Sequence, residues 1–301
     1  MRDPAGQAKD AVAAGKPGGR LFIHDPNLVA GLYVVATPIG NLRDVTLRAL
    51  DVLASADVIC AEDTRVTGKL LAAYGIATPL RPYHDHSKAS ARSEIIALVE
   101  EGKRVALVSD AGTPLISDPG FKLVREMRAA GHPVYAIPGA SSVLAAVASA
   151  GLPTDRFMFV GFPPQKTGAR RKLLEELRTV AATLVFFEGP SRLGASLADM
   201  AACFGDRDAV VARELTKKFE ELRSAPLSAL SAAYSDAPPR GEVVVLVAPP
   251  LETSASVEDL DAMLRGADAD RPLKEVSAEI AEALGLRKRD VYARALELRS
   301  K

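Results

Sequence analysis

Short apolar segments alternate with amphipathic segments between residues 32 and 150, and this alternation limits the possible folds more than any other feature of the sequence. The apolar runs have the length of buried strands and occupy residues 32–36, 57–61, 105–108 and 134–137. The segments around them predict helices at residues 46–56, 66–74, 93–101, 121–130 and 142–149. Strands that alternate with helices form a largely parallel sheet covered on both faces.

A second group of strand-like runs begins after Gly151-Leu152-Pro153, a sequence typical of a domain hinge. These runs occupy residues 157–160, 183–187, 209–212 and 242–248. Helices are predicted among them at residues 169–179, 191–203 and 226–234. We therefore expect an α/β protein with an N-terminal domain at residues 31–150 and a second α/β domain at residues 151–250.

The two ends of the chain differ from this α/β core. Residues 1–30 begin with a stretch rich in Ala, Gly, Pro and Lys that lacks an apolar segment, so we expect a disordered extension and not a signal peptide. Residues 252–270 contain six acidic residues and one basic residue, which predicts a solvated acidic linker with room for a short helix. Residues 271–301 are basic and predict helices at 273–284 and 288–298, as in a helix-turn-helix hairpin. Residues 251–301 therefore form a linker and a hairpin in this interpretation.

Composition narrows the class of protein. Hydrophobic residues make up 48% of the chain and charged residues 25%, values ordinary for a globular enzyme. The formal net charge is zero, so a nucleic acid would have to be met by a local basic patch. No apolar run approaches the roughly 18 residues of a membrane span. Cys60 and Cys203 lie in apolar surroundings, which predicts buried free thiols, and we expect a cytoplasmic protein without membrane contact.

Glycine-rich and polar loops follow the predicted strands, where open α/β sheets bind ligands. The first is Thr37-Pro38-Ile39-Gly40-Asn41, which taken alone is equally a plain turn. The loop at residues 109–120 exceeds the usual length of about two to six residues for such a connection, which indicates function. Pro138-Gly139-Ala140-Ser141-Ser142 opens a helix with small residues, as suits either a ligand at the helix N-terminus or close packing.

Charged side chains follow three further strand-like runs. They are Glu62, Asp63 and Arg65 after residues 57–61, Glu188 and Arg192 after residues 183–187, and Arg213 and Lys217 after residues 209–212. Helix capping and surface salt bridges are the alternatives to a functional role. A metal is not expected, because His84 and His86 fall short of the three or four ligands of a typical site.

Taken together, four of these segments closely resemble the ribosomal RNA small-subunit methyltransferase I family of tetrapyrrole-methylase-like (class III) enzymes, which depend on S-adenosyl-L-methionine (AdoMet). They are Ala36-Thr37-Pro38-Ile39-Gly40-Asn41-Leu42, Ala61-Glu62-Asp63-Thr64-Arg65, Ser109-Asp110-Ala111-Gly112-Thr113-Pro114 and Pro138-Gly139-Ala140-Ser141-Ser142. The resemblance covers about residues 31–248 and, more weakly, the hairpin. It implies a bilobal fold with AdoMet in the cleft between two α/β domains, a homodimer, and 2′-O-methylation of a cytidine ribose in the decoding region of 16S rRNA. The partner would be 16S rRNA or the small ribosomal subunit.

The resemblance also implies the residues that contact AdoMet. They are Pro38, Asp110, Thr113, Ile116, Ser141, Ser142, Phe187, Ala212 and Val243. The charged loops would serve the acceptor, and the candidate catalytic residues are Glu62, Asp63, Glu188 and Lys217. Candidates for contact with RNA phosphates are Arg65, Arg192, Arg213, Lys274, Arg287, Lys288 and Arg289.

Two segments depart from the family pattern. The family usually reads Phe-Tyr-Glu-Ser-Pro-His-Arg where this chain has Phe186-Phe187-Glu188-Gly189-Pro190-Ser191-Arg192, so a histidine role at Ser191 is not available. The family's His-Glu-His-Asn stretch is His84-Asp85-His86-Ser87 here, and we assign it no catalytic role.

Two other functions stay open at the level of sequence. A tetrapyrrole or precorrin methylase would share the AdoMet cleft but needs an open apolar trough for its macrocycle. The Glu-Asp-Thr-Arg loop and the basic hairpin argue against it. The second alternative is an RNA-binding protein with a degenerate cofactor cleft, which the intact series of loops makes less favourable.

Overall fold

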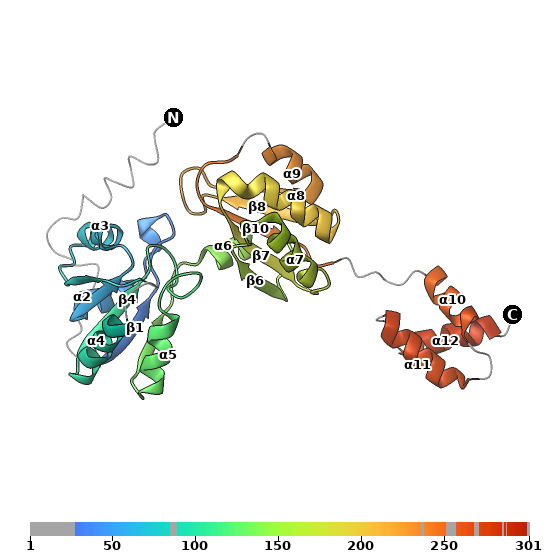
Figure 1. Ribbon diagram of the computed structural model, residues 1–301, viewed down its shortest axis with the longest axis horizontal. Coiled ribbons are helices and arrows are strands. Elements are labelled where there is room, and N and C mark those ends of the chain that lie inside the picture. Colours follow the sequence, from blue (N-terminus) through green and yellow to red (C-terminus); the bar gives the residue numbers. More distant parts are fainter. Residues whose placement is uncertain are drawn as a thin grey trace. The chain divides into compact units, whose positions relative to one another are not determined.

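The computed structural model describes residues 28–84, 89–235, 238–250, 257–267, 271–284, 286 and 288–299. The chain divides into two compact units, Met1–Pro249 and Pro250–Lys301. In the described residues the first unit contains two five-stranded sheets with their helices, and the second contains helices (Figure 1). We call the first sheet with its helices the first lobe, and the second sheet with its helices the second lobe. The predicted α/β class is confirmed.

The first sheet is parallel throughout, as predicted, with the strand order β3-β2-β4-β1-β5. Its strands are β1 Gly31–Val35, β2 Val58–Ala61, β3 Leu80–Pro82, β4 Arg104–Val108 and β5 Val134–Ile137. The helices that follow them are η1 Leu42–Asp44, α2 Leu47–Ser55, α3 Thr64–Tyr74, α4 Ala89–Glu100, α5 Phe121–Ala129 and α6 Ser142–Ser149. Strand β3 is an addition to the prediction, because a short edge strand with an arginine and a proline gives no apolar run.

Alternate residues of each central strand face opposite sides of the first sheet. In β4, Val105 and Leu107 pack with Met127 of α5, whereas Ala106 packs with Leu53 of α2 on the other face. Because both faces are covered, the central strands β2 and β4 are apolar at every buried position, which is why their sequences contain continuous hydrophobic runs.

The second sheet is mixed, with the order β6-β7-β10-β8-β9. Strands β6 and β7 are parallel, and the remaining neighbours are antiparallel. The strands are β6 Phe157–Gly161, β7 Thr183–Glu188, β8 Asp208–Arg213, β9 Glu221–Pro226 and β10 Val243–Val247. The helices are α7 Thr167–Leu177, η2 Pro190–Arg192, α8 Leu193–Phe204 and α9 Leu227–Ser235. Strand β9, which the sequence did not predict, lies at the edge of the sheet and is largely exposed.

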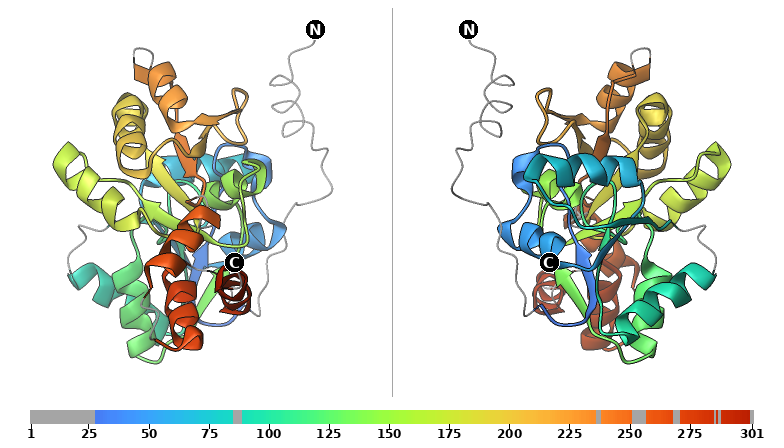
Figure 2. Two further views of the ribbon diagram at one scale, coloured as in Figure 1. Left: turned by 90° about the vertical axis from the view of Figure 1, so that its right-hand side faces the viewer. Right: turned by 90° about the vertical axis from the view of Figure 1, so that its left-hand side faces the viewer.

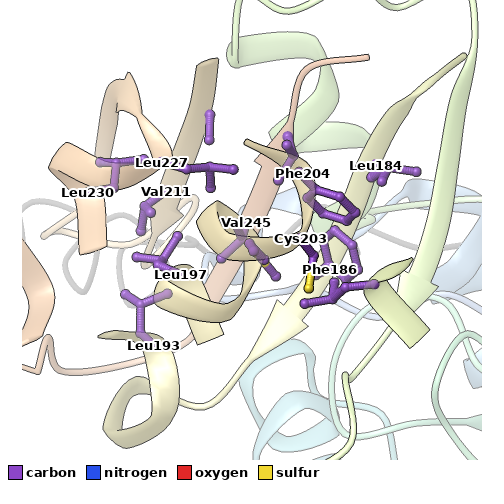
Figure 3. Packing of buried hydrophobic residues seen from close by; sticks show 14 of the residues in the cluster. Leu184, Phe186, Leu193, Leu197, Cys203, Phe204, Val211, Leu227, Leu230 and Val245 are labelled. Atoms are coloured by element: carbon purple, nitrogen blue, oxygen red, sulfur yellow. The ribbon is translucent and has the colours of Figure 1, made fainter. Parts of the chain in front are cut away.

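Helices α7, α8 and α9 cover one face of the second sheet (Figures 1 and 2). Phe186, Val211 and Val245 come from neighbouring strands and pack against Leu197 of α8 and Leu227 of α9 (Figure 3). The opposite face of this sheet packs against α6, which follows the last strand of the first lobe. Helix α6 therefore belongs to the first lobe by sequence and to the core of the second lobe by packing.

The unit from Pro250 to Lys301 contains α10 Val257–Gly266, α11 Leu273–Leu284 and α12 Lys288–Arg299 in its described part. Leu260 of α10 packs with Ile280 of α11 and Val291 of α12. Asp261 is buried and accepts two 2.8 Å hydrogen bonds from the Arg294 guanidinium of α12. The acidic segment thus contains the short helix that the sequence allowed, but this helix is part of the folded core of the unit and is not a solvated linker.

Both cysteines are buried, and the described helices are short. Cys60 and Cys203 are buried free thiols, as predicted, and burial raises the pKa of Cys60 to about 12. Within the described ranges, the helices are all too short or too polar to cross a bilayer.

Candidate functional site

The loops that follow the strands of the first sheet meet at its carboxyl edge. Thr37 and Gly112 exchange backbone hydrogen bonds of 2.8 and 3.0 Å, which join the loops after β1 and β4. The Thr113 hydroxyl donates to the carbonyl of Ala140, at 3.4 Å, in the loop after β5. The loop after β2 joins them because the backbone N–H of Asp63 donates to the Asp110 carboxylate at 2.9 Å. The four loops therefore lie together, as expected for loops that follow the strands of a parallel sheet.

A cavity of about 330 Å³, here called the central cavity, opens between these loops and the second sheet. Ile39 and Gly112 line it from the first lobe, and Gly189 and Val244 line it from the second. Six of the nine positions expected to contact the cofactor also line it: Thr113, Ile116, Ser141, Ser142, Phe187 and Val243. The structure thus brings together residues that are up to 130 positions apart in sequence.

The other three expected cofactor positions lie elsewhere. Pro38 and Asp110 line a neighbouring cavity of about 280 Å³, here called the side cavity. Ala212 is fully buried, and in the β8–β10 pairing it lies opposite Val244, which lines the central cavity. Ala212 is therefore a support of the wall and not part of its surface.

Backbone strain is concentrated in two loops beside these cavities. In the described residues, the non-glycine residues with left-handed φ are Leu115 (74°), Ser117 (64°), Glu214 (51°) and Thr216 (64°). Each such residue costs on the order of 1–3 kcal/mol and persists only where its surroundings hold it. Strain of this kind clusters at ligand-binding loops, which supports a functional interpretation of both segments.

The exposed ring of Phe162 is a part of the site that the sequence interpretation missed. Phe162 follows β6, lines the central cavity and packs edge-on against Phe187 with ring centroids 5.4 Å apart. Its side chain is 56% exposed, which is unusual for an aromatic ring at a cavity. The available signal was the sequence Gly-Phe-Pro-Pro directly after a strand, a stiff turn that holds one aromatic residue.

Two of the carboxylates proposed as catalytic residues have their oxygens engaged. Glu188 is buried, and its carboxylate accepts hydrogen bonds from Gly189 N–H at 2.7 Å, from Arg192 at 2.6 Å and from the Ser196 hydroxyl. Asp63 caps the N-terminus of α3 and pairs with Arg65, whose hydrogen bonds lower the pKa of Asp63 to about 2. Helix capping and ion pairing therefore account for the positions of Asp63 and Glu188. The third candidate carboxylate, Glu62, is half-buried and lies beside Asp63 at the end of β2.

Lys217 reaches from the second lobe across the first-lobe loop at Gly40. A Cβ atom on Gly40 would lie 2.5 Å from Lys217 Cγ, so only glycine leaves room for this crossing. Lys217 Nζ donates at 3.0 Å to Glu214 Oε1 and at 3.0 Å to Glu242 Oε2. Burial opposes the charge of Lys217, but the bonds to these carboxylates raise its pKa, so the ammonium stays protonated at neutral pH. Lys217 lines the side cavity.

The arginines proposed to contact RNA phosphates differ in how exposed they are and in whether they already pair with a carboxylate. Arg65 has a side chain that is 87% exposed, although it pairs with Asp63. Arg192 pairs with buried Glu188, and Arg213 donates to Glu221 at 2.8 Å, so both have structural partners.

The C-terminal unit carries the remaining proposed RNA contacts. Lys274, Lys288 and Arg289 are exposed, and Arg287 lies outside the described residues. Lys288 and Arg289 begin α12, where cations oppose the helix dipole, so they do not stabilise this helix.

Comparisons with known proteins agree with this geometry. The chain matches the family Tetrapyrrole (Corrin/Porphyrin) Methylases over residues 31–231 and the RsmI C-terminal HTH domain over residues 254–299. It is 48% identical over 274 residues to ribosomal RNA small subunit methyltransferase I of Mesorhizobium japonicum, covering 90% of this chain and 93% of that protein. It is 47% identical over 280 residues to the protein of the same name in Pseudomonas aeruginosa, covering 90% of this chain and 98% of that protein.

Solved structures show the same fold. Uroporphyrin-III C-methyltransferase from Thermus thermophilus, complexed with S-adenyl homocysteine, matches with a TM-score of 0.53 and 21% identity over 72% of this chain and 97% of that one. Diphthine synthase matches with a TM-score of 0.56 and 19% identity over 72% of this chain and 89% of that one. The tetrapyrrole-methylase fold is thus confirmed. By sequence, fold and the arrangement of its strand-end loops, the chain belongs to the ribosomal RNA small subunit methyltransferase I family of the tetrapyrrole methylases.

Proposed function

We propose that this protein transfers a methyl group from AdoMet to the 2′-hydroxyl of a cytidine in the decoding region of 16S rRNA. The observation that carries the proposal is the convergence of six expected cofactor positions, from both lobes, on the central cavity. The names of the relatives support small-subunit rRNA as the substrate. The cytidine, its 2′-hydroxyl, a homodimer and a cytoplasmic location are what the family resemblance implies.

The residues around the central cavity fit AdoMet. Its volume of about 330 Å³ lies within the range of small-ligand pockets, about 300–1,000 Å³. Phe187 and Ile116 offer apolar surfaces for the adenosine, and the hydroxyls of Thr113 and Ser142 offer hydrogen bonds. The related fold that holds S-adenyl homocysteine supports this choice of cofactor. When bound, AdoMet supplies an electrophilic methyl group on a sulfonium.

The protein contributes mainly by orienting the acceptor and stabilising charge. A ribose hydroxyl is a poor nucleophile near neutral pH, so stabilisation of its developing negative charge lowers the barrier. An ammonium has three N–H donors, and the carboxylates of Glu214 and Glu242 occupy two donors of Lys217. We assign the third donor to the ribose oxygen of the acceptor. Asp63 is a weak base because its pKa is about 2, which leaves Glu62 as the remaining candidate base among the predicted carboxylates.

The proposed reaction is tested by mapping ribose methylation in 16S rRNA. We expect the rRNA of a strain that lacks this gene to be missing one 2′-O-methyl group on a cytidine, as read by mass spectrometry of nuclease fragments. The wild-type gene should restore it, and purified protein with AdoMet should add it to small subunits from the deletion strain. Uroporphyrinogen serves as the control acceptor. Unchanged rRNA in the deletion strain, or methylation of uroporphyrinogen alone, would contradict the proposal.

The C-terminal unit is proposed to bind RNA through its exposed cations. Because Lys288 and Arg289 oppose the dipole of α12, their replacement by glutamine should leave the thermal stability of the protein unchanged or slightly higher. RNA binding should weaken, and the slope of log Kd against log salt should fall by about one for each phosphate that the variant no longer neutralises. Filter binding at several salt concentrations measures this slope. Arg265→Gln, in the same unit, is the matched control, and equal slopes in all variants would count against an RNA-binding role for the start of α12.

A further inference from the structure

The loop between β8 and β9 carries an aromatic side chain that faces solvent. Phe219 is 65% exposed, more than any other large hydrophobic residue in the described part of the chain. It lies two residues after Lys217, which lines the side cavity, so the Cα atoms of the two residues are at most about 7 Å apart. We propose that Phe219 stacks on a base of the RNA next to the acceptor cytidine. This inference rests on the proposed function.

Phe219 stands at the tip of a tight turn, where folding alone does not favour an aromatic residue. The backbone N–H of Lys217 donates to the Glu214 carbonyl at 3.0 Å, and that of Glu220 donates to the Lys217 carbonyl at 3.2 Å. Lys218 and Phe219 are therefore the central residues of the second of two consecutive turns. Such positions usually hold Gly, Pro, Asn, Asp or Ser. A partner outside the chain thus provides a physical reason for a large ring at this tip.

The loop holds the Phe219 ring in place before any ligand binds. Thr216 has a left-handed φ of 64°, and its backbone N–H donates to the Glu220 carboxylate at 2.6 Å, which ties the first turn to the second. Lys218 Nζ lies 5.7 Å from the centre of the Phe219 ring, within the range of a cation–π contact. A ring that is already ordered loses little conformational freedom on binding, so more of its contact energy contributes to affinity.

The surroundings of Phe219 favour a base over a phosphate or the cofactor. The neighbouring cations Arg213 and Lys217 already pair with carboxylates. Proteins bind single-stranded RNA by stacking aromatic side chains on its bases, and a cation beside the ring adds to this attraction. Phe219 lies outside the walls of both cavities, so a ligand at this ring is distinct from a cofactor in the central cavity. Because Lys217 is proposed to contact the acceptor ribose, a ring this close to it would meet the base of a neighbouring nucleotide.

Phe219→Ala separates contact with RNA from support of the fold. At saturating AdoMet we expect the KM for methyl-free small subunits to rise about tenfold, the effect of losing one stacked base. The melting temperature should not change, because the residue is exposed, and neither should the Kd for AdoMet, measured by calorimetry. Phe219→Trp should keep the wild-type KM. Phe219→Leu should resemble Phe219→Ala, since leucine is apolar but has no ring to stack.

Phe121→Ala is the matched control for an exposed ring. Phe121 is 63% exposed, and the Arg125 guanidinium lies 5.6 Å from the centre of its ring, so it resembles Phe219 in both respects. It belongs to α5 and also lies outside the walls of both cavities. Its loss should leave the KM for small subunits unchanged.

Each contrary result has a distinct meaning. An unchanged KM in Phe219→Ala, or an equal rise in Phe121→Ala, would overturn the proposal. A wild-type KM in Phe219→Leu would show apolar contact in place of stacking, and a weaker Kd for AdoMet would assign the ring to the cofactor; either would overturn it too. Altered sedimentation of the protein alone, with unchanged KM, would assign the ring to a contact between protein chains.

The affinity for RNA can also be measured without methyl transfer. Binding of methyl-free small subunits in the presence of S-adenosylhomocysteine should weaken about tenfold in Phe219→Ala, as the KM does. Equal binding by Phe219→Ala and wild-type protein would overturn the proposal by a route that does not depend on turnover. Failure of the wild-type protein to methylate rRNA would count against the proposed function alone.

Discussion

Replacement of Asp199 by alanine is expected to lower the free energy of unfolding by about 3–5 kcal/mol, the largest stability effect of any single change considered. Asp199 and Arg170 are both buried, with side chains only 4% exposed, and Arg170 Nε donates to the Asp199 carboxylate at 2.7 Å. The second oxygen of Asp199 accepts from Arg171 at 2.7 Å. Removal of the carboxylate leaves the Arg170 guanidinium buried without its counter-charge, and this penalty exceeds the worth of the pair itself.

The same change should also weaken cofactor binding. Arg170 donates to the carbonyl of Gln165 at 3.2 Å, and so holds the loop that carries Phe162 at the central cavity. Urea unfolding measures the loss of stability, and calorimetry at a temperature where both proteins are folded measures the AdoMet affinity.

Two further variants distinguish a buried unpaired charge from a simple loss of side-chain packing. Arg171→Ala should leave the urea midpoint nearly unchanged, because the Arg171 side chain is 55% exposed. The double variant Arg170→Met with Asp199→Leu should recover most of the stability, since no buried charge remains. A loss below about 1 kcal/mol for Asp199→Ala would contradict the argument.

The fold was predictable from sequence where strands are buried on both faces. The buried residues of strands β4 and β10 form continuous apolar runs because helices pack on both sides of each sheet. Edge strands β3 and β9 escaped prediction because exposure allows polar residues and prolines at their positions. The sequence of helix α10 was assigned to a linker because its acidic residues suggested exposure to solvent and hid the signal of its few apolar residues. Its buried Asp261 is balanced by Arg294, a partner 33 residues away that local sequence does not reveal.

The candidate site was predictable only in part, for a related reason. Loops such as the one around Gly112 directly follow strands. Parallel strands bring their carboxyl ends to one edge of the sheet, so the order of strands and loops in the sequence already predicts that these loops meet. The roles of carboxylates were not predictable in this way. Asp63 and Glu188 both follow strands, as catalytic carboxylates often do, yet their oxygens are engaged by neighbours.

Replacement of Lys217 by methionine is expected to lower the single-turnover rate of methyl transfer by about 100-fold, the effect of removing one donor to a developing negative charge. The methionine side chain fills a similar space beside Gly40 but carries no charge. The Kd values for AdoMet and for RNA should change little, because the proposed contact strengthens only as the ribose oxygen becomes negative. Rapid-quench assays with saturating AdoMet and methyl-free small subunits measure the rate.

Several variants test whether the effect belongs to the charge of Lys217. Lys218→Met, at the exposed neighbouring position, is the matched control and should retain the wild-type rate. Lys217→Arg should keep part of the activity, because the charge remains. Gly40→Ala should approach the Lys217→Met rate with little loss of stability, since its Cβ would overlap the lysine stem and force it away.

The pH profile provides an independent check of the same assignment. The folded-state pKa of Lys217 is raised above its ordinary value of 10.5, so the ammonium is fully present below that pH and is lost only as pH rises through the folded value. The ratio of wild-type to Lys217→Met rates should therefore stay constant between about pH 7 and pH 9. A ratio that falls within this window would show that a group with a lower pKa supplies the effect. Wild-type activity of Lys217→Met at every pH would rule out this role for Lys217 and leave orientation of the acceptor and the candidate base Glu62 to account for catalysis, because Glu188 and Asp63 are already engaged.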